Sequence, residues 1–123
     1  MDNRRSNKII ELTFQFSLDI IQIVEKLESN RKYVIANQLL KSGTSIGANV
    51  RESQNAESKS DFIHKLKIAL KETDETLYWL ELVNAAYKNI DSTKLIEDLK
   101  IIDKVLSKIV STIKNKQKES LSN

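Results

Sequence analysis

The chain contains no proline, and its two glycines, Gly43 and Gly47, lie four residues apart in one segment. Proline interrupts a helix, and glycine costs a helix about 1 kcal/mol relative to alanine. A chain that nearly lacks both can therefore form long uninterrupted helices. Apolar residues make up 40% of the 123 residues and charged residues 30%, which is typical of a folded globular domain. These features predict an all-α protein with a single domain over residues 1–123.

The spacing of apolar residues divides the chain into four helices. Apolar positions recur at intervals of three and four, which places them on one face of a helix, and short polar stretches separate the runs. Ser58 with Asp61, and Asp91 or Ser92, are typical helix starts. The pattern predicts an antiparallel up-down-up-down four-helix bundle with helices at about residues 6–28, 33–57, 60–88 and 92–116, followed by a frayed C-terminal tail.

The segment with the two glycines allows two interpretations. Glycine and hydroxyl residues cluster in Ser42-Gly43-Thr44-Ser45, as they do in a turn between two short helices. Alternatively, the helix continues, and the missing side chains let the backbone of a neighbouring helix approach closely. Both interpretations are compatible with the residues.

Polar and mixed residues form two further stripes on the second and third predicted helices. Buried polar groups must be paired, so we expect four polar residues on one flank of the second helix to form an internal hydrogen-bonded layer that fixes helix register: Gln38, Ser45, Asn49 and Glu52. On the third helix, a stripe that combines two carboxylates with the only tryptophan indicates an oligomer or partner interface: Ile68, Glu72, Glu75, Trp79 and Leu82.

The sequence lacks the signatures of catalysis and of metal or cofactor binding. Without cysteine the chain can form no disulfide, thiol nucleophile or thiolate metal site. The only histidine, His64, is expected at the surface, and Glu72 and Glu75 lack the histidines of a di-iron bundle. The glycine segment lacks the Gly-Lys-Ser/Thr ending of a phosphate-binding loop. We therefore expect a protein that is not an enzyme and takes no cofactor, metal or small-molecule substrate.

The first apolar stretch does not have the composition of a membrane span or a signal peptide. Charged and amide residues interrupt it throughout, at Glu11, Gln15, Asp19 and Gln22. We expect a cytoplasmic protein that has no membrane partner.

The charge of the chain is mildly basic, with a formal net charge of +3. Counted by segment, the excess lies at the two ends of the sequence, in residues 1–32 and 91–123. Lysine and arginine bind phosphate through charge, but no recognition helix or aromatic stacking platform accompanies them. The candidate nucleic-acid-binding residues are the lysines of the tail together with Arg4, Arg5, Lys8, Arg31, Lys32, Lys41, Arg51 and Lys59.

Two stretches of the sequence carry a specific order of residues. The first comprises Gln38–Ser42, Thr44–Val50 and Glu52, and the second comprises Asp61–Ile63, Lys65-Leu66, Ile68-Ala69, Lys71-Glu72, Asp74–Thr76 and Tyr78–Leu80. Together they resemble the four-helix bundle family of the 23S rRNA intervening-sequence proteins. The resemblance covers residues 33–83, and the outer helices match only in length and apolar pattern.

This resemblance implies an antiparallel four-helix bundle that assembles into a ring of five, with continuous helix through Ser42–Gly47. The family is bacterial, and a related branch is the accessory variability protein of diversity-generating retroelements. That branch is a basic pentameric barrel that binds nucleic acid and a reverse transcriptase. We therefore expect a homopentamer that binds RNA or a ribonucleoprotein through a basic surface. The alternative is a protein-interaction scaffold or accessory subunit without direct nucleic-acid contact.

Overall fold

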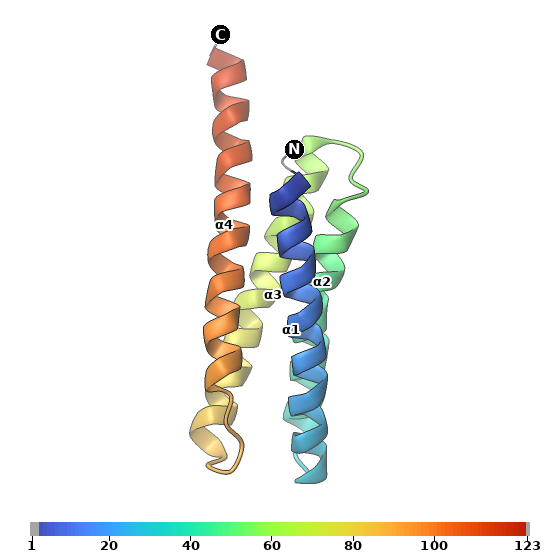
Figure 1. Cartoon of the computed structure of the whole chain (residues 1–123), viewed down its shortest axis with the longest axis vertical. Coiled ribbons are helices and arrows are strands. Elements are labelled where there is room, and N and C mark those ends of the chain that lie inside the picture. Colours follow the sequence, from blue (N-terminus) through green and yellow to red (C-terminus); the bar gives the residue numbers. More distant parts are fainter. Residues whose placement is uncertain (1–2, 123) are drawn as a thin grey trace.

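A computed structural model describes the backbone of residues 3–122 and the side chains of residues 8–121. Four helices alternate in direction along one axis (Figure 1). They are α1 Asn3–Ser29, α2 Tyr33–Ser53, α3 Lys59–Ala86 and α4 Thr93–Ser122. The described part of the chain contains no strand. The predicted all-α four-helix bundle is confirmed.

Each helix packs against its neighbour in sequence, and α4 closes the bundle against α1. The α1–α4 contact is the least extensive of the four, and the last turns of α4 project beyond the other helices (Figure 1). The α1–α2 and α3–α4 connections lie at one end of the bundle, which we call the closed end. The α2–α3 connection, the start of α1 and the last turns of α4 lie at the other end, which we call the open end.

The core is built from the apolar stripes of all four helices. Burial of such a side chain contributes about 1.5–3 kcal/mol, and several large ones are almost fully buried: Phe16, Ile20, Leu39, Ile46, Leu66, Leu80, Leu99 and Leu106. One polar contact crosses this core between α2 and α3. The hydroxyls of Ser42 and Thr76 are fully buried and hydrogen-bonded to each other at 3.0 Å.

The glycine segment lies inside one continuous helix, as the resemblance implied. A Cβ atom added at Gly43 would lie 2.8 Å from Cγ1 of Ile20, and one added at Gly47 would lie 3.2 Å from the carbonyl oxygen of Thr13. Both neighbours belong to α1. The glycines therefore let α1 and α2 approach more closely than side chains would permit.

The ends of the central helices are set by local hydrogen bonds. α2 ends at Ser53 rather than at residue 57, because the next three amides each bond to a carbonyl three residues back and so form turns. The hydroxyl of Ser58 accepts a hydrogen bond from the Asp61 amide at 3.0 Å and caps α3, as predicted. At the start of α4, the Asp91 carboxylate accepts from the Thr93 amide at 3.0 Å.

The last helix is longer than the sequence pattern predicted. α4 continues to Ser122, six residues beyond the predicted end at residue 116. Residues 117–121 contain no glycine or proline and include glutamine, lysine, glutamate and leucine, which favour helix.

Candidate nucleic-acid interface

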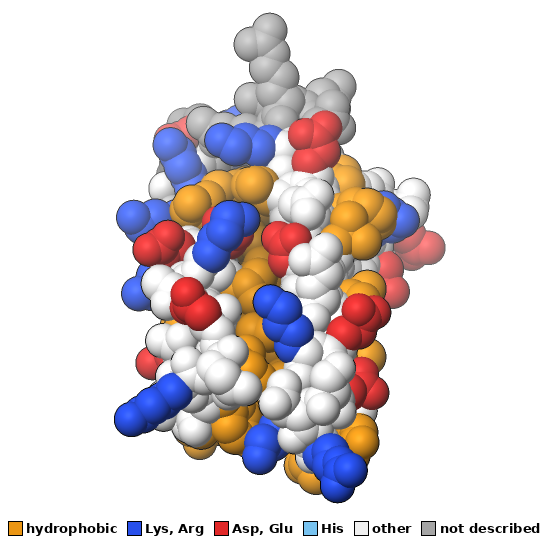
Figure 2. Space-filling view, turned by 60° about the horizontal axis from the view of Figure 1, so that its bottom comes forward, with side chains coloured by type: hydrophobic (Ala, Val, Ile, Leu, Met, Phe, Trp, Pro, Cys, Tyr) orange, Lys and Arg blue, Asp and Glu red, His pale blue; other side chains and the backbone are white. Residues whose placement is uncertain are grey.

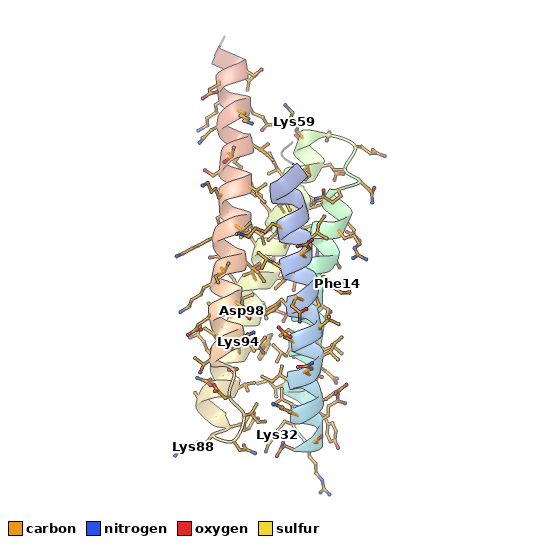
Figure 3. All side chains as sticks on the ribbon, viewed as in Figure 1. Phe14, Lys32, Lys59, Lys88, Lys94 and Asp98 are labelled. Carbon is orange, nitrogen blue, oxygen red and sulfur yellow. The ribbon has the colours of Figure 1, made fainter. Side chains whose placement is uncertain are left out.

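The basic residues predicted from the sequence do not gather on one surface of the chain. Lys32 lies at the closed end, where Lys88 also lies, whereas Lys59 lies at the open end (Figure 3). Charges of both signs are intermixed on the face that includes the closed end (Figure 2). The side chains of Arg4 and Arg5 lie outside the described residues. Apart from Lys59 and the tail lysines, which lie at the open end, the predicted set therefore forms no continuous basic patch among the described side chains.

Two of these cations pack against aromatic rings. The ammonium of Lys32 lies 5.0 Å from the centre of the Tyr87 ring, and the guanidinium of Arg51 lies 5.8 Å from the centre of the Phe14 ring. Such cation–π contacts hold the charged groups against the protein surface. The others are exposed at separate places: Lys8 on α1, Arg31 in the α1–α2 connection and Lys41 on α2.

The polar residues expected in an internal layer lie on the side of α2 that meets α3, as exposed or half-buried groups: Gln38, Ser45, Asn49 and Glu52. The side chains of two of them bond to carbonyls of their own helix, and the carboxylate of Glu52 pairs with Nζ of Lys65 at 3.3 Å. The predicted internal layer is therefore wrong within the chain. Small hydroxyls from Ser42 and Thr76 make the buried contact instead, because burying an amide or carboxylate without full pairing is costly.

The stripe predicted as an interface follows one side of α3, with Ile68, Glu72 and Trp79 half-buried and Glu75 and Leu82 exposed. Gln38 and Trp79 line the same hollow, and the Glu52–Lys65 ion pair connects the two helices further along. Trp79 is half-buried, and its Nε1 atom has no hydrogen-bond partner among the described residues. The structure thus brings two separately predicted sets together, and we call the combined surface the α2–α3 face.

A separation of charge emerges from the packing of α3 against α4. Because the two helices are antiparallel, residues 59–71 of α3 and residues 100–118 of α4 both lie toward the open end, where Phe62 and Ile113 line one hollow. These two segments contain two aspartates and ten lysines: Lys59, Lys65, Lys67, Lys71, Lys100, Lys104, Lys108, Lys114, Lys116 and Lys118. The rest of the chain contains ten basic and fifteen acidic residues. We call the two packed segments the lysine-rich end.

The lysines of this end lie close to one another. A side-chain hydrogen bond with Lys67, followed by repulsion from its charge, lowers the pKa of Lys114. A hydrogen bond between two lysine amines requires one of them to be neutral, so the lowered pKa has a direct cause. Farther out, Lys59 on α3 and Lys116 on α4 line one hollow. An anion bound here would relieve the repulsion between these ammonium groups.

Ion pairing neutralises little of this charge among the described side chains. Lys65 pairs with Glu52, whereas the other pair, Lys94 with Asp98, lies outside the lysine-rich end (Figure 3). All ten lysines except Lys65 are exposed. The end therefore presents a positive surface to solvent.

Six of these lysines were not candidates in the sequence: Lys65, Lys67, Lys71, Lys100, Lys104 and Lys108. Counting charge along the chain hides them, because the first half of α3 and the second half of α4 are separated by a stretch with seven acidic residues and two lysines, residues 72–99. The signal was available in principle. A charge count made after pairing the predicted third and fourth helices in antiparallel order would have found it.

The described residues contain neither a metal-binding group nor a membrane-spanning helix. No group of three or more acidic or histidine side chains there is arranged to hold a metal ion, and His64 is exposed. None of the helices combines the length and the apolar character needed to cross a membrane.

Comparison with known proteins places these features in a family. Residues 5–111 match the model of the 23S rRNA-intervening sequence protein family. A crystal structure of a protein of unknown function from the S23 ribosomal protein family of Bacteroides thetaiotaomicron is 39% identical in sequence. The similarity covers 87% of this chain and 98% of that one, with a TM-score of 0.81. No curated protein matches the sequence.

Proposed function

We propose that this chain, which belongs to the 23S rRNA-intervening sequence protein family, is a non-enzymatic protein that binds RNA, free or in a ribonucleoprotein, through its lysine-rich end. The observation that carries the proposal is the separation of charge. Ten lysines and two aspartates give the lysine-rich end a net charge of +8, whereas the rest of the chain has a net charge of −5. The overall value of +3 hides this difference.

Charge of this density favours a polyanion for a physical reason. Ammonium groups that neutralise phosphates release condensed counterions, and this release gives a binding free energy that falls as salt rises. The lysines are mostly exposed and lie on helices, so they are available without a conformational change. RNA is the polyanion that the family's name suggests.

We also propose that copies of the chain assemble, as the ring of five that the resemblance implies. Assembly would present several lysine-rich ends to one RNA and increase the avidity without new contacts. Large apolar side chains exposed near the α2–α3 face support a contact between copies: Tyr33, Val34 and Leu82.

The proposal is tested by measuring RNA affinity over a series of salt concentrations. We expect the affinity of the wild-type protein to fall steeply with salt, and Lys100→Glu/Lys104→Glu to weaken it by about tenfold or more at low salt. The matched control is Lys26→Glu/Lys88→Glu, which makes the same charge change in α1 and near the closed end and should lower the affinity far less. Salt-independent binding, or an equal loss in both variants, would contradict the proposal.

A second candidate function is a protein-interaction scaffold without direct RNA contact. The α2–α3 face favours it, because this face combines a half-buried tryptophan with polar groups that pair only within their own helix or across to Lys65. Buried aromatic anchors dominate the energetics of protein interfaces. In this case the lysine-rich end would contribute solubility but no binding.

A further inference from the structure

Helical spacing places six exposed lysines of the lysine-rich end along the outer sides of two neighbouring helices. On α4, positions 100, 104, 114 and 118 fall within an arc of roughly 80° and span about 27 Å of helix. On α3, Lys67 and Lys71 are one turn apart. This part of α3 lies against the second half of α4, because Phe62 and Ile113 line one hollow. We call this set the lysine row: Lys67, Lys71, Lys100, Lys104, Lys114 and Lys118.

The residues around the lysine row offer contacts to phosphate and no means of reading bases. Ser107 and Ser111, which are exposed, occupy the positions between the lysines of α4. The two segments contain no arginine, tyrosine or tryptophan, and their only phenylalanine, Phe62, is 8% exposed. The one exposed ring is the imidazole of His64, which is not part of the row. Proteins read bases with bidentate arginine and amide groups in a groove, or by stacking aromatic rings on unpaired bases. The row has neither feature.

We infer that the lysine row binds the phosphate backbone of double-helical RNA and does not read its sequence. The inference rests on the proposed function and specifies the form of RNA that is bound. A duplex holds its phosphates at fixed spacing. The two packed helices likewise hold the Cα atoms of the lysines at fixed positions. The α4 part of the row is about 27 Å long, so it can lie along several successive phosphates of one duplex. A single strand is held chiefly by stacking on aromatic rings, and the row provides none.

The charge along the α3–α4 pair limits where the duplex can lie. Beyond the row, residues 72–99 carry seven acidic groups and two lysines, so they repel phosphate. The exposed aromatic residue next along α3 is Tyr78, which is 58% exposed. Its ring packs edge-on against Trp79 at 5.3 Å, and Asp74 lies between it and Lys71 in the sequence. The duplex is therefore confined to the open end.

The test compares three RNA probes by fluorescence anisotropy at one salt concentration. The first is a hairpin whose stem is longer than the lysine row, the second is the same hairpin with a scrambled stem sequence, and the third is an unstructured single strand of equal length. The proteins are wild type, Lys67→Glu/Lys114→Glu, the matched control Lys26→Glu/Lys88→Glu, and Tyr78→Ala. Circular dichroism confirms that each variant is folded.

We expect both hairpins to bind with similar affinity and about tenfold more tightly than the single strand. Lys67→Glu/Lys114→Glu should reduce hairpin binding by about tenfold or more, whereas the control and Tyr78→Ala should change it little. Equal or tighter binding of the single strand, or a large loss in Tyr78→Ala, would overturn the inference while leaving the proposed function intact. Absence of binding to all three probes would instead overturn the proposed function.

Discussion

At the scale of single residues, Gly43 sets the distance between α1 and α2. The neighbouring atom of Ile20 belongs to a fully buried side chain, which cannot rotate away cheaply. Gly47 faces a backbone carbonyl, which can move even less. The same two residues that suggested a turn in the sequence therefore serve the packing of a continuous helix.

Replacement of Gly43 by alanine should lower the stability of the fold. Overpacking of this kind costs typically 1–3 kcal/mol, and the better helix propensity of alanine returns up to about 1 kcal/mol. We expect a net loss of about 1–2 kcal/mol in the free energy of unfolding, measured by urea denaturation.

The control for this substitution is Asn37→Ala, which gains helix propensity at an exposed position of the same helix. Its stability should be unchanged or higher. If Gly43→Ala proved as stable as Asn37→Ala, the close approach of the two helices would not depend on the glycine.

At the scale of elements, apolar periodicity predicted the four helices, because the burial of every third or fourth residue is what holds a bundle together. The helix ends were harder to predict. The end of α2 depends on turn-forming hydrogen bonds after Ser53, and the length of α4 depends on a helix-favouring tail that lacks a breaker. Neither feature appears in the apolar pattern.

The size of the side chains explains why the polar residues of α2 are not in the internal layer predicted for them. Helical spacing placed Gln38 and Asn49 correctly on one flank of α2, but it did not indicate how much room lies between α2 and α3. The space there accommodates the hydroxyls of Ser42 and Thr76, which are fully buried. The longer side chains lie at the outer edge, on the α2–α3 face.

This face makes a prediction about assembly. Trp79→Ala should lower the mass of the particle measured by light scattering, because it removes the largest partly buried side chain of the face. Phe14→Ala is the matched control, since it removes an aromatic ring that is 53% exposed on α1, which does not pack against α3. An unchanged mass for Trp79→Ala would show that the face does not join copies of the chain.

At the scale of the whole molecule, the antiparallel order of α3 and α4 separates charge within a weakly basic chain. The lysine-rich end of this helix pair is positive, whereas residues 72–99 at its other end are acidic. The segments 59–71 and 100–118 are far apart in the sequence and adjacent in the fold. Charge counted along the chain could not reveal this arrangement, whereas the fold class was readable from local spacing. The candidate site thus depends on which helix segments the fold brings together. Most of its lysines were therefore not identified from the sequence.

The most direct test of this account is lysine footprinting, in which the reactivity of each lysine toward an amine-modifying reagent is measured by mass spectrometry with and without hairpin RNA. The account predicts protection at Lys67, Lys71, Lys100, Lys104 and Lys114, with unchanged reactivity at Lys26, Lys32 and Lys88. Protection of Lys32 and Lys41 without protection of the lysine row would contradict it and return the site to the basic residues named from the sequence.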